Sequence, residues 1–283
     1  KKINIINNKH IFITGLPRSG TTVLLNYLYS TELFTSLKYS NMPFITAPNF
    51  SNYFKKNKTK MFERFHKDNI NINLDSPEAF DEAFFSMFDE KEIKDELIRY
   101  IELILLKEKP KRYLSKNNHN YKRIDLLLSI FPMSCFLITV REPLQQAYSL
   151  LLQHINFTKL QKKDDFVRRY MNYLKHNEFG VDHSSWNSPN LYNNFDDINY
   201  WLEQWLLFYQ NLYLNYKNNK SCKFVIYDKI DQIEKIEEIN LFTETKLVKD
   251  FKFQVSNKDI SLKFDQNLYE QAQKVYFQFI NKT

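Results

Sequence analysis

The chain has 283 residues, of which 43% are hydrophobic and 26% are charged. This composition excludes a disordered or fibrous protein, and the length suffices for one large domain or two small ones. No stretch approaches the roughly 18 uninterrupted apolar residues that a membrane-spanning helix needs. The formal net charge of +7 favours an anionic partner without distinguishing a nucleic acid, a nucleotide and an acidic glycan. The two cysteines, Cys135 and Cys222, cannot form a disulfide framework or a structural zinc site, so we expect a reducing, cytoplasmic compartment.

A glycine-containing loop follows the first predicted strand. The chain has only three glycines, against an average usage of roughly 7%, and Gly15 and Gly20 both lie in this loop. Residues 10–14 are typical of a short buried strand, and an apolar helical run follows from Val23 to Tyr29. Two glycines at this spacing, followed by two threonines, are typical of a phosphate-binding loop, in which backbone N–H groups and a helix N-terminus surround an anion. We therefore expect a phosphate or an isosteric group at this loop.

The loop departs from the pattern of nucleotide hydrolases. Thr21 stands where that pattern has a lysine, and the cation of the loop is Arg18. The buried strand predicted at 135–140 ends in Arg141, where a magnesium-binding aspartate would be expected. These differences disfavour a magnesium-dependent ATP enzyme, and we expect no metal ion.

A second anion site is predicted after that strand. Pro143 suits the first turn of a new helix, and Ser149 follows Arg141 by eight residues. In this helix Gln145, Ser149 and Gln153 share one face, so Ser149 can point toward the same anion as Arg141.

These residues resemble the sulfotransferases that use 3′-phosphoadenosine 5′-phosphosulfate (PAPS). In that family a loop of the form G-x-P-R-S-G-T-T holds the 5′-phosphosulfate, and a strand ending in R-x-P with a later serine holds the 3′-phosphate. Residues 113–118 and 131–136 are similar to the bacterial and tyrosylprotein-type branch, and 225–230 resembles its Y-E-D-L segment, with Asp228 and Ile230 as departures. The resemblance implies that the cofactor-binding residues are Arg18, Ser19, Gly20, Thr21, Thr22, Arg141 and Ser149.

The resemblance also implies the reaction. The expected donor is PAPS, the expected product is adenosine 3′,5′-bisphosphate (PAP), and the acceptor is a hydroxyl group of a carbohydrate or small metabolite rather than a nucleic acid. A sulfuryl group carries less negative charge than a terminal phosphoryl group, so in-line transfer needs positioning and fixed cationic donors rather than a metal ion.

A general base must take the proton of the acceptor hydroxyl as it attacks sulfur. His66 is our first candidate, with Asp68 as the group that orients it. Glu63 and Glu78 are alternatives, although Glu78 is also explained as part of a helix start after Ser76 and Pro77. The resemblance implies that Lys116 neutralises the sulfate or the bridging oxygen.

The acceptor site has weaker signals. His154, on the helix that carries Ser149, and His176 are candidate substrate contacts. Gly180 follows a helical run and is interpreted as its C-terminal cap. The aromatic run from Asp196 to Tyr216 has helical spacing and is interpreted as core.

We expect a single α/β domain over residues 1–283, with a P-loop-type central parallel sheet flanked by helices. Strands are predicted near 10–14, 112–115, 135–140 and 223–227. Helices are predicted near 20–30, 121–131, 143–157, 164–177, 196–217 and 264–280, with a mostly helical insertion at about 32–110. A P-loop small-molecule kinase and a non-catalytic module that binds nucleotides or anionic glycans are the alternative functions.

Overall fold

The computed structural model describes residues 5–53, 61–63, 71–78, 80–89, 92–106, 111–174, 176–188 and 191–282. The strands are β1 (Ile11–Thr14), β2 (Phe34–Thr35), β3 (Phe62–Glu63), β4 (Asn71–Ile72), β5 (Arg112–Lys116), β6 (Cys135–Val140) and β7 (Cys222–Ile226). The α-helices are α1 (Thr21–Ser30), α2 (Glu82–Phe85), α3 (Ile93–Leu105), α4 (Ile124–Ile130), α5 (Pro143–Lys163), α6 (Asp165–Tyr173), α7 (Ile198–Tyr216), α8 (Ile233–Thr243) and α9 (Gln266–Lys282). Short 3₁₀ helices are η1 (Tyr39–Phe44), η2 (Pro48–Tyr53), η3 (Asn118–Arg123) and η4 (Tyr227–Lys229).

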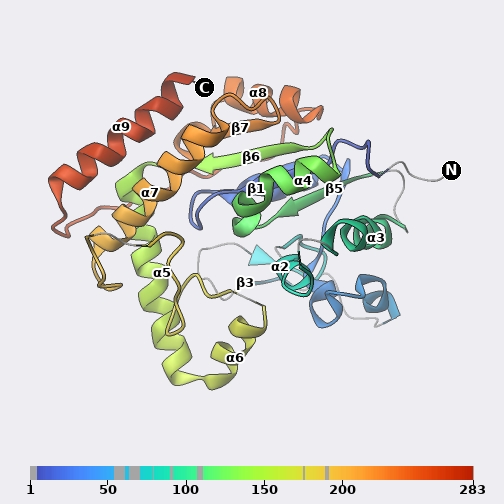
Figure 1. Cartoon of the computed structure of the whole chain (residues 1–283), viewed down its shortest axis with the longest axis horizontal. Helices are drawn as coiled ribbons and strands as arrows, with labels where there is room; N and C mark the ends of the chain where they lie inside the picture. Colours follow the sequence, from blue (N-terminus) through green and yellow to red (C-terminus); the bar gives the residue numbers. More distant parts are fainter. Residues whose placement is uncertain are drawn as a thin grey trace. The chain divides into compact units, whose positions relative to one another are not determined.

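The main sheet is parallel, has five strands in the order β2-β5-β1-β6-β7, and is flanked by helices (Figure 1). Ile11 and Ile13 of β1 pair with Leu114 and Lys116 of β5. Every residue of β1 and β6 is buried, as expected for strands that are covered on both faces. The predicted α/β class is confirmed, and β1, β5, β6 and β7 correspond to the four predicted strands.

Some element boundaries differ from the prediction. The helix expected at 121–131 starts as η3 and continues as α4, while β2 and α8 were not predicted. The helix expected to reach residue 177 is α6, which ends at Tyr173 with Leu174 as its C-cap. The prediction that Gly180 caps this helix is therefore wrong. Gly180 has φ +93° and packs against Gln161, whose side-chain amide fills the space that a Cβ would occupy.

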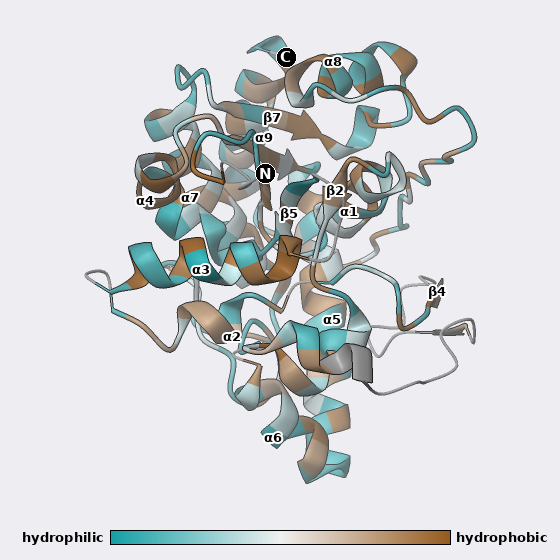
Figure 2. Ribbon diagram, turned by 90° about the vertical axis from the view of Figure 1, so that its right-hand side faces the viewer, coloured by the Kyte–Doolittle hydropathy of each residue, from teal (hydrophilic) through white to brown (hydrophobic). Residues whose placement is uncertain are grey.

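The chain divides into two compact units, and the first comprises residues up to Thr14, Thr22–Phe136 and Asn240–Phe251. In its core the rings of Phe12 and Phe136 stack with centroids 5.1 Å apart. Helix α3 has alternating hydrophobic and hydrophilic residues (Figure 2) and buries most of the hydrophobic ones together with Tyr100, which stacks on Phe84. Burial of one apolar helix face explains why a sequence rich in charged residues forms this helix.

The second unit comprises Gly15–Thr21, Leu137–Ile239 and Lys252–Thr283. Helix α7 packs against both α5 and α9 (Figure 1). Trp201 and Trp205 of α7 are fully buried, in agreement with the interpretation of this aromatic run as core. The indole N–H of Trp205 donates to Gln146 Oε1 (3.0 Å) and to the carbonyl oxygen of Arg141 (3.2 Å), so a core side chain contacts the residue that directly follows β6. None of the helices in the described ranges is both long and apolar enough to cross a membrane.

Candidate functional site

The loop between β1 and α1 has an unusual backbone. Gly15, Arg18 and Gly20 all have positive φ, at +142°, +68° and +90°. A Cβ on Gly15 would lie 2.5 Å from Thr139 Oγ1, and one on Gly20 would overlap the ring of Tyr227. Both glycines are therefore needed for conformation and for close approach. Since α1 begins at Thr21, the loop leads into first-turn N–H groups that have no partner within the helix.

Ser19 holds the loop in this shape. Its side chain is fully buried, and its hydroxyl donates to the carbonyl oxygen of Leu16 (2.6 Å). The same oxygen is 2.6 Å from Thr139 Oγ1 on β6. Thr21 and Thr22 are the first two residues of α1. The Ser19 hydroxyl thus ties the loop to β6 in this structure.

Three of the predicted cofactor residues come together in the second unit. Arg18 Nε donates to Ser149 Oγ on α5 (3.2 Å), and Arg141 Nη1 donates to the carbonyl oxygen of Arg18 (3.2 Å). Arg141 has an exposed fraction of 3%, and its Nε is buried without a hydrogen-bond partner among the residues that the structure describes. A buried guanidinium with an unused donor fits a phosphate oxygen, because guanidinium groups bind phosphates through several parallel hydrogen bonds.

A segment near the C-terminus adds a further cation. Arg141 Nη2 donates to the carbonyl oxygen of Ser256, and Tyr227 OH donates to that of Gln254 (2.9 Å). Two residues beyond Ser256, the Nζ of Lys258 lies 5.9 Å from the ring centroid of Tyr148. Burial lowers the pKa of Lys258, and the positive charges of Arg18 and Arg141 lower it further.

Burial also lowers the pKa of the Arg141 guanidinium. The charged forms of Arg141 and Lys258 are thus both disfavoured in the folded protein. An anion that accepts hydrogen bonds from Arg18, Arg141 and Ser149 would relieve the repulsion among the positive charges of Arg18, Arg141 and Lys258. These side chains suit a phosphate group.

The segment at 225–230, which resembles the Y-E-D-L motif, contacts both the loop before α1 and the start of α5. The ring of Tyr227 packs against Gly20, and Arg141 Cζ lies 4.9 Å from its centroid. Asp228 Oδ2 accepts hydrogen bonds from the backbone N of Glu142 and from Tyr276 OH, both at 2.8 Å. Asp228 therefore fixes the start of α5, which carries Ser149.

Lys116 and Glu78 form an ion pair in the first unit, with 3.7 Å between Nζ and Oε1. Both side chains are largely buried, and Tyr39 OH donates to Glu78 Oε2 (2.6 Å). Helix α2 begins four residues after Glu78 and has Asp81 as its N-cap, so the assignment of Glu78 to a helix start is wrong. The backbone N of Glu78 instead donates to the carbonyl oxygen of Leu37 (3.0 Å).

A buried carboxylate holds the residues on either side of Lys116. Asp81 accepts hydrogen bonds from Ser115 Oγ and from Asn117 Nδ2 (3.1 Å). Burial raises the pKa of Asp81, which these hydrogen bonds partly oppose. The carboxylate therefore fixes the end of β5, where Lys116 lies opposite Ile13 of β1.

The remaining candidates are placed as follows. His66 and Asp68 lie outside the described residues. His154 has an exposed fraction of 5%, accepts a hydrogen bond from the backbone N of Gly180 (3.3 Å), and packs against Trp201. Burial lowers its pKa. His176 is half-buried, with Nδ1 3.5 Å from Glu178 Oε2. Substrate contacts by His154 and His176 stay predictions.

Lys258 and the contacts of Tyr227 were not predicted from the sequence. Lys258 lies in a stretch without helix or strand, more than 100 residues after Arg141, so no local pattern could have connected the two. The tyrosine belonged to a recognised segment, but only the structure shows that its ring fills the space beside Gly20.

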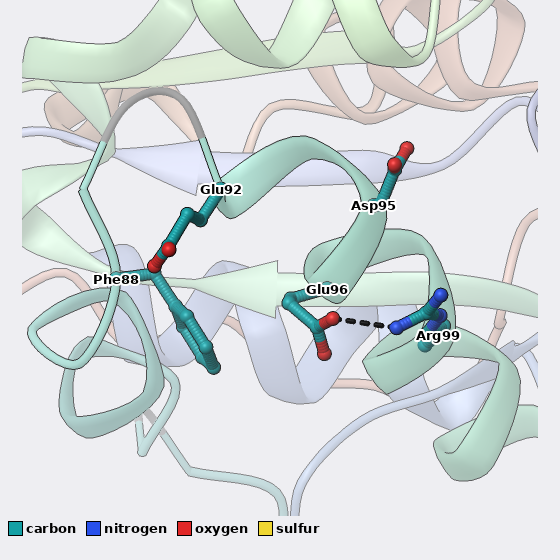
Figure 3. A pocket seen from close by; sticks show the side chains of 5 residues that line it. All are labelled: Phe88, Glu92, Asp95, Glu96 and Arg99. Carbon is teal, nitrogen blue, oxygen red and sulfur yellow. Dashed lines mark hydrogen bonds and ion pairs between the residues drawn. The ribbon is translucent and has the colours of Figure 1, made fainter.

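A pocket in the first unit is lined by Phe88, Glu92, Asp95, Glu96 and Arg99 (Figure 3). Arg99 Nη1 donates to Glu96 Oε1 (2.6 Å), which leaves Glu92 and Asp95 as further acidic groups at the wall. Because carboxylates outnumber cations there, the pocket does not suit an anionic nucleotide.

Comparisons with known proteins agree with the fold. The sequence profile of the Sulfotransferase family matches residues 10–200. Sulfotransferase STF1 from Mycobacterium tuberculosis H37Rv is 12% identical, with a TM-score of 0.51 over 99% of this chain and 78% of that one. Sulfotransferase STF9 from Mycobacterium avium is 14% identical, with a TM-score of 0.50 over 98% and 77%. Mouse sulfotransferase SULT7A1, solved in complex with PAP, is 12% identical, with a TM-score of 0.40 over 99% and 69%. No curated protein matches the chain.

Proposed function

The chain belongs to the sulfotransferase family, and from that premise we propose that it transfers a sulfuryl group from PAPS to a hydroxyl group of a carbohydrate or small metabolite. The donor carries two anionic groups, a 5′-phosphosulfate and a 3′-phosphate. The loop before α1 offers backbone donors and a helix N-terminus for the first, and Arg141 and Ser149 offer side-chain donors for the second.

One observation carries the proposal: Arg18 is linked by hydrogen bonds to both Arg141 and Ser149, although it lies more than 120 residues before them in the sequence. Arg18 belongs to the loop, and its Nε donates to Ser149 Oγ, which supports a role between the two anionic groups. Gly20, Thr21 and Thr22 would bind the 5′-phosphosulfate through the loop and the first turn of α1, while Ser19 keeps the loop in shape. Lys258 lies two residues after Ser256, whose carbonyl oxygen accepts from Arg141 Nη2, and its backbone is bonded to Gln145 on α5, so we include it among the groups that bind the donor.

When bound, PAPS supplies an activated sulfuryl group with PAP as its leaving group. The protein has to orient this group, stabilise charge that develops on the leaving phosphate, and accept the proton of the acceptor hydroxyl. We assign charge stabilisation to the loop and to Lys116. No metal ion is part of the proposal.

We assign the general base to His66, oriented by Asp68, and keep Glu78 as the second candidate. Glu78 gains support from its ion pair with Lys116 and from its limited exposure of 10%. Tyr39 OH donates a hydrogen bond to the other oxygen of the same carboxylate (2.6 Å).

The experiment uses the purified chain, PAPS labelled with ³⁵S, and a panel of monosaccharides, oligosaccharides and small phenolic and aliphatic alcohols. The proposal predicts that label moves to at least one hydroxyl acceptor with formation of equimolar PAP. Tight PAP binding without transfer to any acceptor would favour a non-catalytic module. Transfer of phosphate from magnesium ATP to the same acceptors would favour the kinase alternative.

A further inference from the structure

A segment without helix or strand, residues 254–258, crosses the arginine site of the second unit; we call it the C-terminal strap. Its backbone is tied down at three residues. The carbonyl oxygen of Gln254 accepts from Tyr227 OH (2.9 Å), and that of Ser256 accepts from Arg141 Nη2. At Lys258 both backbone groups are bonded to one side chain, that of Gln145.

The side-chain amide of Gln145 bonds both the N–H and the C=O of Lys258, as the backbone of a neighbouring strand does in a sheet. Its Nε2 donates to the carbonyl oxygen of Lys258 (2.9 Å), and its Oε1 accepts from the backbone N of Lys258 (2.8 Å). Gln145 is the third residue of α5, and its own backbone N donates to Glu142 Oε2 (2.7 Å) at the helix cap. A side chain anchored on a capped helix thus fixes the backbone of a segment that no regular structure holds.

Without the two hydrogen bonds from Gln145, we expect the ammonium group of Lys258 to move away from Arg18 and Arg141. Arg18 and Arg141 are near enough to lower its pKa, so the three positive charges repel one another. No carboxylate among the described residues forms an ion pair with Lys258; its described side-chain contact is with the ring of Tyr148. A lysine side chain also loses considerable conformational entropy when it is held in one place. An unattached strap would therefore carry the ammonium into solvent.

We propose that Gln145 is a positioning residue for the nucleotide: its side-chain amide fixes the backbone of Lys258 and so keeps the ammonium beside Arg18 and Arg141 at the 3′-phosphate site. This inference rests on the proposed function and assigns a role to a residue that does not itself touch the phosphate.

The test compares two ligands by isothermal titration calorimetry: PAP, and adenosine 5′-phosphate, which lacks the 3′-phosphate. The variants are Gln145→Ala, Gln145→Met, Lys258→Ala and the double variant Gln145→Ala/Lys258→Ala. Methionine keeps the volume of glutamine but forms neither hydrogen bond, so it separates packing from positioning. Lys252→Ala is the matched control, because it removes the same charge from an exposed lysine six residues earlier in the chain.

We expect Gln145→Ala and Gln145→Met each to weaken PAP binding by about tenfold, as for the loss of one charge-assisted hydrogen bond. Binding of adenosine 5′-phosphate should be unchanged in both. The double variant should bind PAP no more weakly than Lys258→Ala, since the glutamine acts only through the lysine. The control should bind both ligands like the wild type.

Three results would overturn the inference: equal weakening of both ligands, wild-type PAP affinity in Gln145→Met, or additive losses in the double variant. Failure of the proposed donor site gives a different result, because the wild-type protein would then bind PAP no better than adenosine 5′-phosphate. Failure of sulfuryl transfer alone would appear only in the ³⁵S assay and would leave these affinities unchanged.

Discussion

Replacing Arg141 by methionine separates the contribution of this residue to folding from its contribution to binding. The guanidinium is buried, and burial lowers its pKa, so the folded protein bears a cost for keeping it charged. Methionine removes that cost and keeps contact with the ring of Tyr227. The substitution also removes the hydrogen bonds to the carbonyl oxygens of Arg18 and Ser256, which contribute about 1.5 kcal/mol each, at the lower end for a charged donor, and which offset the cost of burying the charge. Because buried charges are often replaced by apolar side chains without loss, we expect the free energy of unfolding to stay within about 1 kcal/mol of the wild-type value.

Binding should respond much more strongly than folding. Loss of a charged hydrogen-bond donor to phosphate costs about 1.5–3 kcal/mol, which corresponds to a PAP dissociation constant raised by about 10- to 150-fold. The same loss is expected for Arg18→Ala. If Arg141 only stabilised the fold, its replacement would change the free energy of unfolding strongly and the PAP affinity little.

The assay pairs calorimetric titration with PAP and urea unfolding of the same protein preparations. Arg168→Met is the matched control, because Arg168 lies on α6 and binds Asp182 instead (2.6 Å). The control should bind PAP with wild-type affinity. Unchanged PAP affinity in Arg141→Met, together with a marked loss of stability, would refute the assignment of Arg141 to the anion site.

Three further predictions concern the loop, the pH dependence and the base. Gly20→Ala should destabilise the protein by about 2 kcal/mol or more and abolish PAP binding, because φ +90° and the Tyr227 ring leave no place for a Cβ; wild-type urea unfolding would contradict this. Burial lowers the pKa of His10 to about 4, so the unfolded chain takes up the proton first as the pH falls. Stability from His10 should be fully present above about pH 6.5 and decline by about 3 kcal/mol toward pH 4, and the non-titrating His10→Asn should show a shallower decline in urea midpoint; equal slopes would argue against it. His66→Ala should retain PAP affinity but lose turnover, and full turnover would transfer the role of base to Asp68, Glu63 or Glu78.

Local sequence was sufficient to predict the elements that carry the loop. Strands β1 and β6 are continuous apolar runs, and a run of this kind is recognisable because parallel strands are buried on both faces. The glycines of the loop were informative because the chain has so few of them. The two-residue strand β2 was missed, since its pairing with β5 depends on tertiary position and not on any periodicity.

Long-range partners could not be predicted in the same way. The bonds between Gln145 and Lys258 join residues 113 positions apart, and nothing in the composition of either segment indicates the other. Glu78 was assigned to a helix start because Ser76 and Pro77 precede it, but its carboxylate pairs with Lys116 on β5. In both cases the partner is distant in the sequence, so local propensity cannot predict it.

The most direct test of the account is calorimetric titration of the wild-type protein with PAP and, separately, with ATP and magnesium. The loop and the cluster of Arg18, Arg141 and Ser149 predict micromolar binding of PAP and no binding of magnesium ATP. The reverse preference would contradict the assignment of two phosphate sites and would favour a kinase.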